Sequence, residues 1–206
     1  MSTRDKYAAL ADGFAEHEYA DPARYAARRA AVISGLGPPV EAGETVLDLC
    51  CADGIMAAPL SDLGLVYSGV DATEEMIEAA RKRNPELEFV VGRMEKFEPP
   101  GPVDVTICLR SFYLAEDRVA FFRRVRAYTT KKFVFDFRPM VFSREEIVDQ
   151  LRTAGFSRIE LQPFFLPQRK AVPGFVLPIL SALEHSGPFG LELANRVGCI
   201  FCSAAA

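Results

Sequence analysis

Short apolar segments alternate with amphipathic segments from residue 45 onward, and this alternation constrains the fold more than any other feature of the chain. The apolar segments span residues 45–50, 66–71, 87–91, 103–109 and 132–137. Their nearly continuous apolar character is typical of strands that are buried on both faces. Helical patterns occupy residues 73–83, 117–128 and 143–154. The alternation predicts βαβ units, and therefore a parallel sheet with helices on both faces.

The regions that flank this alternation also carry recognisable patterns. A helical stretch covers about residues 5–34, and a further strand is expected at 157–165. Residues 166–196 are rich in proline and aromatic residues, which suggests short helices, and a last strand is expected at 197–203. A chain of 206 residues suits one domain with a sizeable core.

The composition is that of a soluble globular protein, since half of the residues are hydrophobic and a quarter are charged. The net charge of −4 disfavours a nucleic-acid partner, because binding to phosphate backbones usually requires a basic surface. Residues 1–6 lack the apolar core of a signal peptide, and the longest apolar stretch, 172–180, is too short to span a bilayer. We therefore expect a cytoplasmic protein without a membrane partner; monomer and homodimer both remain open.

Two of the five cysteines, Cys199 and Cys202, form a C-x-x-C motif. They fall in the expected strand 197–203, where side chains three positions apart point to opposite faces. This spacing suits neither one shared metal ion nor a redox pair, which normally opens a helix. We interpret these cysteines as small buried hydrophobic residues and expect no metal site.

Candidate ligand-binding residues follow four of the expected strands. In an open α/β sheet, ligands bind beyond the carboxyl ends of the strands, where the strand order reverses. The first candidate is a turn of small residues at 48–54, which lets a ligand approach the backbone. Asp71 ends the next strand and is placed to accept hydrogen bonds from a ribose. Residues 91–95 and 109–113 follow the third and fourth strands.

Four motifs at these places resemble those of the class I S-adenosylmethionine-dependent methyltransferases. They are VLDLCCADG at 46–54, GVDATEEMIEAARKR at 69–83, VDVTICLRSFYL at 103–114 and FSREEIVDQLRTAGF at 142–156. The resemblance covers about residues 40–160 in order and spacing. It implies a Rossmann-like, seven-stranded, mostly parallel sheet with an antiparallel last strand. It also implies a single domain with a helical lid at 1–40, a cofactor-binding core at 41–160, and C-terminal strands with an acceptor-side insertion at 161–206.

The same resemblance implies that the cofactor is S-adenosylmethionine and assigns roles to individual residues. The turn at 48–54 would hold the methionine part and Asp71 the ribose. Ala72 and Met76 would flank the adenine, whose edge the backbone of Met94 would face. The expected cofactor-binding residues are Asp48, Cys50, Ala52, Gly54, Asp71, Ala72, Met76, Arg93, Met94, Glu95 and Leu109.

Three positions depart from the family pattern. Cys50 and Ala52 stand where glycines are usual, but both are small enough for the turn to persist. Arg93 stands where an acid often faces the adenine amine, so either Glu95 takes that role or the contact is lost.

Several of these residues also have a purely structural interpretation. Met76 lies on the apolar face of its helix, where a core role is as plausible as an adenine contact. Asp71 could be the N-cap of the following helix. Gly54 could be an ordinary turn glycine, and Arg110 a solvated side chain.

The candidates for catalysis are His17, Tyr113 and His185. A hydroxyl acceptor would need a general base, for which histidine is suited at neutral pH, and the chain has only these two histidines. In the family, an N-terminal helical segment often covers the cofactor and an insertion before the last strand often forms the acceptor pocket. We expect at least one of the three residues to contact the acceptor, a small molecule of aromatic or hydrophobic character.

Two other functions compete with methyl transfer. An NAD-dependent oxidoreductase would use a similar sheet, but its G-x-G-x-x-G fingerprint is missing. A non-catalytic S-adenosylmethionine-binding protein would keep the fold without turnover, and the altered turn at 50–52 and Arg93 are compatible with it.

Overall fold

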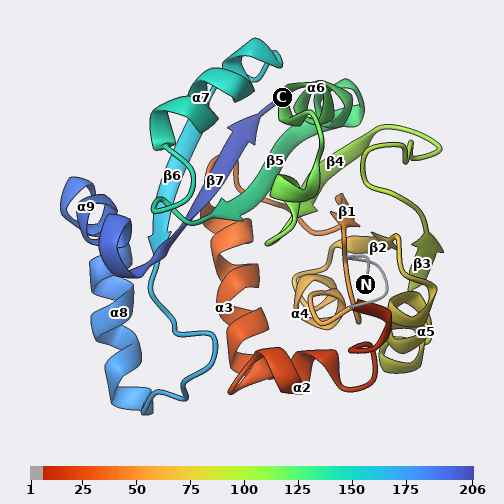
Figure 1. Cartoon of the computed structure of the whole chain (residues 1–206), viewed down its shortest axis with the longest axis horizontal. Helices are drawn as coiled ribbons and strands as arrows, with labels where there is room; N and C mark the ends of the chain where they lie inside the picture. Colours follow the sequence, from red (N-terminus) through yellow and green to blue (C-terminus); the bar gives the residue numbers. More distant parts are fainter. Residues whose placement is uncertain (1–6) are drawn as a thin grey trace.

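The computed structural model describes residues 7–206; the polar segment 1–6 and the start of the helical stretch predicted from residue 5 lie outside the described residues. Seven strands form one sheet in the order β3-β2-β1-β4-β5-β7-β6 (Figure 1). Their bounds are β1 (Thr45–Leu49), β2 (Val66–Asp71), β3 (Glu88–Val91), β4 (Val103–Cys108), β5 (Thr129–Phe137), β6 (Ile159–Phe164) and β7 (Cys199–Ala205).

The strand directions confirm the predicted Rossmann-like sheet. The pairs β1–β2, β1–β4, β2–β3 and β4–β5 are parallel, whereas β7 runs antiparallel to both β5 and β6. The strand order reverses between β1 and β4, so a ligand crevice is expected at the carboxyl ends of these strands. β5 begins three residues earlier than predicted, because Thr129 is buried and its hydroxyl bonds that of Thr106 at 2.7 Å.

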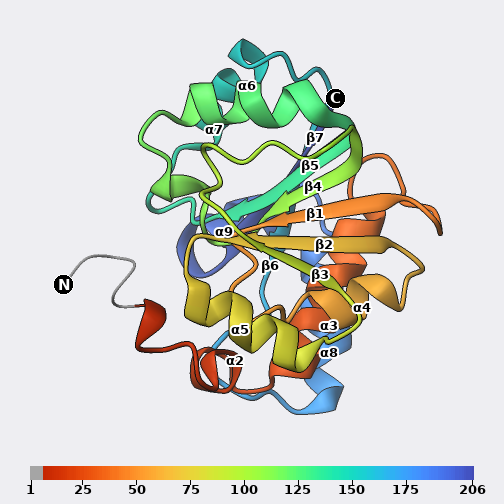
Figure 2. The same ribbon diagram turned by 90° about the vertical axis from the view of Figure 1, so that its right-hand side faces the viewer.

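Helices cover both faces of the sheet, as predicted (Figure 2). α3 (Pro22–Gly35), α4 (Ala57–Ser61) and α5 (Glu74–Arg83) lie on one face, and α6 (Arg118–Tyr128) and α7 (Arg144–Thr153) on the other. The insertion between β6 and β7 forms the short helix η2 (Gly174–Val176), then α8 (Leu177–Glu184) and α9 (Pro188–Val197). A further short helix, η1 (Phe112–Leu114), follows β4.

The helical stretch predicted over about residues 5–34 contains two separate helices among the described residues. α2 (Phe14–Glu18) ends before α3 begins at Pro22. Proline disfavours helical backbone at the residue before it and is tolerated at the first helical position. The Asp21 carboxylate caps the new helix by accepting the backbone N–H of Arg24 at 3.1 Å.

Two features of the described residues bear on the predicted partners. None of their helices has the length and apolar character needed to cross a membrane. Within residues 7–206, no three His, Cys, Asp or Glu side chains gather as a possible metal site, and the five cysteines are free thiols.

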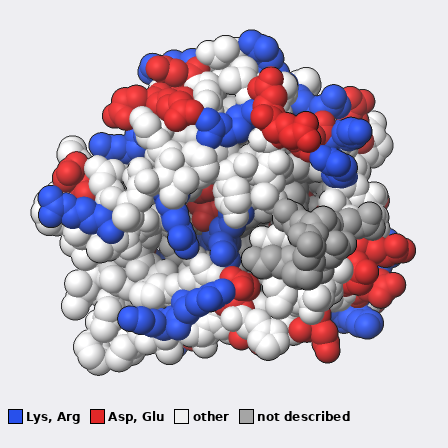
Figure 3. All heavy atoms as spheres, in the orientation of Figure 1, with Lys and Arg blue, Asp and Glu red and all other residues white. Residues whose placement is uncertain are grey.

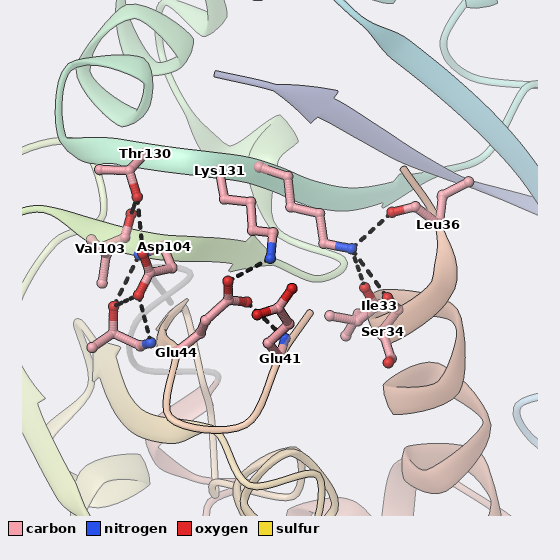
Figure 4. Close-up of polar contacts among 11 residues, drawn as sticks. Ile33, Ser34, Leu36, Glu41, Glu44, Val103, Asp104, Thr130 and Lys131 are labelled. Carbon is pink, nitrogen blue, oxygen red and sulfur yellow. Dashed lines mark hydrogen bonds and ion pairs between the residues drawn. The ribbon is translucent and has the colours of Figure 1, made fainter. Parts of the chain in front are cut away.

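A polar network lies at the edge of the sheet where β4 and β5 begin (Figure 4). This edge is opposite the carboxyl ends of β1 and β4, where a ligand is expected and which we call the ligand edge. Asp104 accepts hydrogen bonds from the backbone N–H and the hydroxyl of Thr45. Lys131 forms an ion pair with Glu44. The next side chain, Lys132, is fully buried and donates to backbone carbonyls at the end of α3, which ties that helix to β5.

Candidate functional site

The turn after β1 has an unusual backbone. Cys50, Ala52 and Gly54 all have positive φ, at 62°, 49° and 71°. The left-handed conformation costs a residue with a side chain about 1–2 kcal/mol, so it normally requires glycine. The predicted turn therefore forms although Cys50 and Ala52 replace glycines, and its strained backbone must be held by its surroundings.

Gly54 is required by packing as well as by its backbone. A Cβ atom at this position would approach Asn84, Ala80 and Phe89 to 3.0–3.1 Å. The Asn84 side-chain amide also donates to the Gly54 carbonyl at 3.1 Å. Gly54 thus fits the turn closely against α5, in agreement with the structural interpretation of this residue.

Replacing Ala52 by glycine should raise the free energy of unfolding by about 0.5–1 kcal/mol. The relief of left-handed strain exceeds the extra entropy that glycine gains in the unfolded chain. The exposed helical residue Ala58 in α4 gives a control of opposite sign, because Ala58→Gly should destabilise by about 1 kcal/mol. Urea unfolding of the three proteins measures both changes, and a destabilised Ala52→Gly variant would contradict the strain argument.

Asp71 connects the end of β2 to this turn. Its carboxylate accepts the backbone N–H of Ala52 at 3.1 Å and that of Thr73 at 2.9 Å. The N-cap of α5 is Thr73, so the interpretation of Asp71 as that cap is wrong. Each carboxylate oxygen can accept a second hydrogen bond, and the side chain stays partly exposed beside Ala72. Burial raises the pKa of Asp71.

Asp48 lies near the end of β1 and is almost fully buried, at 2% exposure. The Tyr67 hydroxyl donates to its carboxylate at 2.8 Å. Burial raises the pKa of Asp48 to about 7, although the bond from Tyr67 lowers it. A carboxyl with this pKa favours a cationic neighbour, because a positive charge would restore the ionised form.

The segment after β3 meets the same turn through sulfur contacts. Met94 is buried, with its Sδ atom 3.5 Å from Sγ of Cys50 and 4.0 Å from Sγ of Cys108. Leu109 is also buried, at the end of β4. Arg93 and Glu95 instead pair with each other at 2.9 Å.

Glu95 also accepts the backbone N–H of Glu116 at 2.9 Å. Its carboxylate therefore joins two loops, and a contact with an adenine amine stays a prediction. The exposed Arg93 has no other ion pair among residues 7–206.

The N-terminal segment packs directly onto the turn. Ala11 and Phe14 form a buried cluster with Met76, and Ala52 packs against it. Met76 thus has the core contacts of its structural interpretation, but these contacts come from the segment expected to act as a lid.

Asp53 anchors this segment, a role that the sequence analysis missed. Its buried carboxylate accepts the backbone N–H of Ala15 at 3.0 Å and pairs with Arg83 at 2.8 Å. Arg83 pairs in turn with Glu16. An acid inside a turn of small residues was the available signal for this anchor.

The three catalytic candidates lie in different places. His17 is exposed in the last turn of α2, and His185 is exposed after α8, with Nδ1 2.7 Å from the Ser181 carbonyl oxygen. Tyr113 is 46% exposed in η1 and contacts the Phe142 ring. Among residues 7–206, no hydrogen bond or ring contact joins these three to one another.

Burial has the largest effect on the pKa of Tyr113 and raises it, whereas the positive charges of Arg110 and Arg138, which follow β4 and β5, lower it. The Tyr113 hydroxyl therefore stays protonated and suits a hydrogen-bond donor better than a base.

Five phenylalanines that lie after β4 or from the end of β6 onward differ in burial. Three are buried in the core, whereas two in the β6–β7 insertion are exposed. The buried ones are Phe112, Phe164 and Phe165, and the exposed ones are Phe175 and Phe189.

Comparisons with known proteins agree with this geometry. Residues 46–132 match the family model described as a methyltransferase domain. The mitochondrial ubiquinone biosynthesis O-methyltransferase of Schizosaccharomyces pombe is 32% identical over 74 residues. That match takes in 32% of this chain and 27% of the yeast protein, so the chain spans about a quarter of this relative's length.

Two solved structures share the fold. One is the methyltransferase in a complex with the Trm112 activator from Haloferax volcanii, with a TM-score of 0.70, 21% identity, and 100% of this chain and 99% of that chain covered. The other is magnesium protoporphyrin IX methyltransferase from Synechocystis with bound S-adenosylmethionine, with a TM-score of 0.58, 17% identity, and 89% and 77% covered. Residues 46–132 therefore match a methyltransferase domain, and the strand order and the turn joined to Asp71 are those that the resemblance to class I S-adenosylmethionine-dependent methyltransferases implies.

Proposed function

We propose that this protein transfers the methyl group of S-adenosylmethionine to a small-molecule acceptor. The observation that carries the proposal is the hydrogen bond from the backbone N–H of Ala52 to the Asp71 carboxylate. This hydrogen bond holds the turn after β1, whose backbone a ligand can approach, beside an acid of the kind that binds a ribose. Both lie at the edge of the sheet where the strand order reverses.

The residues present fit the cofactor. S-adenosylmethionine supplies a methyl group on a sulfonium that is its own leaving group. Asp71 would bind the ribose, while Asp48 would favour the positive charge of the methionine part. The chain would mainly hold the acceptor and the cofactor in line, which can supply on the order of 7–11 kcal/mol of the barrier.

A small-molecule acceptor is supported by charge and by the elements around the turn. The net charge of −4 disfavours a nucleic-acid substrate. The loop after β6 and the N-terminal segment meet where Glu18 accepts a hydrogen bond from Gln168 and pairs with Arg169, and both segments would flank a bound acceptor.

Calorimetric titration with S-adenosylhomocysteine and with NAD tests the cofactor. We expect binding of S-adenosylhomocysteine and none of NAD; the reverse would favour an oxidoreductase. Release of S-adenosylhomocysteine from S-adenosylmethionine with a panel of hydroxyl and amine acceptors then tests transfer. Tight cofactor binding without release for any acceptor would favour a non-catalytic binding protein.

The affinity for S-adenosylmethionine should rise about tenfold between pH 6 and pH 8. In the free protein the Asp48 carboxyl has a pKa of about 7. It is therefore mostly protonated below pH 7, and binding a cation beside it must release that proton. Because the ionised fraction grows about tenfold over this range, the affinity should follow it and level off above pH 8.

The matched control for this pH dependence is Asp48→Asn. Asparagine keeps an acceptor for the Tyr67 hydroxyl but does not titrate. Calorimetry at several pH values should give a flat profile for this variant. An equally steep profile would mean that another group carries the dependence.

Combined replacement of the catalytic candidates should lower turnover at least about a hundredfold, the lower range of general acid–base catalysis. The variant carries His17→Gln, Tyr113→Phe and His185→Gln, with single variants to divide the effect. S-adenosylhomocysteine affinity should stay constant, because none of the three belongs to the cofactor set. Full turnover by the triple variant would exclude all three residues from the reaction.

A further inference from the structure

The ligand edge of the sheet carries opposite charges on its two halves. Asp48 and Asp71 lie at or near the ends of β1 and β2, the half assigned to the cofactor. Arg110 and Arg138 follow the ends of β4 and β5, and Arg169 follows β6. Because β4, β5 and β6 run in the same direction, these three arginines gather on the acceptor half.

The three arginines surround a cavity of about 460 Å³, which Gln168 also lines. Figure 3 shows basic side chains gathered near the centre of the face that Figure 1 views. Arg138 is exposed, and no carboxylate among residues 7–206 pairs with its guanidinium. The cavity is therefore lined by cationic groups with unused hydrogen-bond donors.

The backbone of Arg110 is held in a strained conformation. Its φ is 58°, and its N–H donates to the Asp136 carboxylate at 2.6 Å. Asp136 forms a buried ion pair with Arg29 at 2.8 Å, so Arg29 balances its charge. Strain that a buried network maintains is typical of functional positions. Here it fixes the start of the Arg110 side chain at the cavity.

One carboxylate of the chain, that of Glu18, already pairs with two of the arginines that line the cavity. Glu18, the last residue of α2, pairs with Arg169 at 2.8 Å and with Arg110 at 3.6 Å. The Gln168 amide also donates to it at 2.9 Å. The three arginines and Glu18 leave a net charge of +2 around the cavity. The site thus holds one oxyanion and retains charge for another.

We propose that the methyl acceptor carries an oxyanion, a carboxylate or a phosphate, which binds Arg110, Arg138 and Arg169 in this cavity. The arginine fork matches the two oxygens of such a group and fixes its orientation. The anionic end of the acceptor is held away from the acidic half, so its nucleophilic end can face the cofactor. The identification of the bound anion as the methyl acceptor rests on the proposed function, whereas the anion site itself rests on the arginines.

The test uses probes that are small and chemically paired. The full chain, with and without S-adenosylhomocysteine, is titrated with benzoate, benzamide and inorganic phosphate at constant ionic strength. We expect benzoate or phosphate to bind and benzamide not to bind; the tighter of the two anions identifies the kind of oxyanion.

Arg138→Gln should weaken binding of that anion by about tenfold, the factor that corresponds to about 1.4 kcal/mol. Arg123→Gln removes the same charge from an exposed position on α6 and should leave the affinity unchanged. Glu18→Gln should tighten binding, because it removes the competing carboxylate. Thermal unfolding confirms that each variant is folded.

The outcomes separate the two proposals. Equal anion affinity in Arg138→Gln and the unchanged protein would overturn the anion site, as would benzamide binding as tightly as the tighter of the two anions. The same holds if neither anion binds. If S-adenosylhomocysteine fails to bind while anion binding still depends on Arg138, the proposed function fails and the anion site stands. If S-adenosylhomocysteine binds while anion binding does not depend on Arg138, the anion site fails and the proposed function stands.

Discussion

Replacing Asp71 by asparagine should weaken the binding of S-adenosylhomocysteine about thirtyfold, which corresponds to about 2 kcal/mol. The carboxylate accepts the backbone N–H groups of Ala52 and Thr73, so it shapes the turn at the edge where we propose that the cofactor binds. An asparagine side chain has a single acceptor oxygen and presents an N–H₂ group to the other donor. Calorimetry of both proteins measures the loss.

Asp62→Asn is the matched control, because Asp62 is exposed after α4 and the change in charge is the same. Its affinity should equal that of the unchanged protein. A second ligand, the 2′-deoxy form of S-adenosylhomocysteine, separates direct ribose binding from disturbance of the turn. If Asp71 binds the 2′-hydroxyl, removing both partners should cost less than the sum of the two single changes.

An additive result in that cycle would assign Asp71 to the shape of the turn alone. An unchanged affinity in Asp71→Asn would be more severe, because it would remove the residue on which the cofactor site depends. Unfolding of the ligand-free variant, followed in urea, shows whether the turn has loosened.

Replacing Lys132 by methionine should lower the free energy of unfolding by about 3 kcal/mol. The ammonium group donates to the carbonyl oxygens of Ile33 at 2.7 Å, Leu36 at 2.8 Å and Ser34 at 3.4 Å. Methionine fills a similar volume but leaves these carbonyls without their donor. Each buried carbonyl without a partner costs about 1–3 kcal/mol, and removing the buried charge offsets part of that cost.

The neighbouring Lys131→Met variant provides the control (Figure 4). Lys131 is partly exposed and pairs with Glu44, a kind of ion pair that contributes at most about 1 kcal/mol. Urea unfolding at neutral pH should therefore separate the two lysine variants clearly. Similar stabilities would contradict the capping role of Lys132. Activity should change little in either variant, since both residues lie away from the ligand edge.

The sequence by itself determined the strands, the helices on both faces and the position of the turn after β1. Alternation of buried strands with amphipathic helices depends on local periodicity, which a sequence displays directly. The contact between Ala52 and Asp71 was also predictable, because the ends of adjacent parallel strands must meet. The break between α2 and α3 was signalled by Asp21 and Pro22, although the prediction passed over it.

Only the tertiary structure decided which charged side chains act together. Glu18 meets Arg169 across about 150 positions of sequence, and Arg29 meets Asp136 across 107. Neither pair leaves a periodic trace, because an ion pair requires only that two side chains arrive at one place. Local patterns determine elements, whereas the three-dimensional arrangement of those elements determines the charge of the cavity that they enclose.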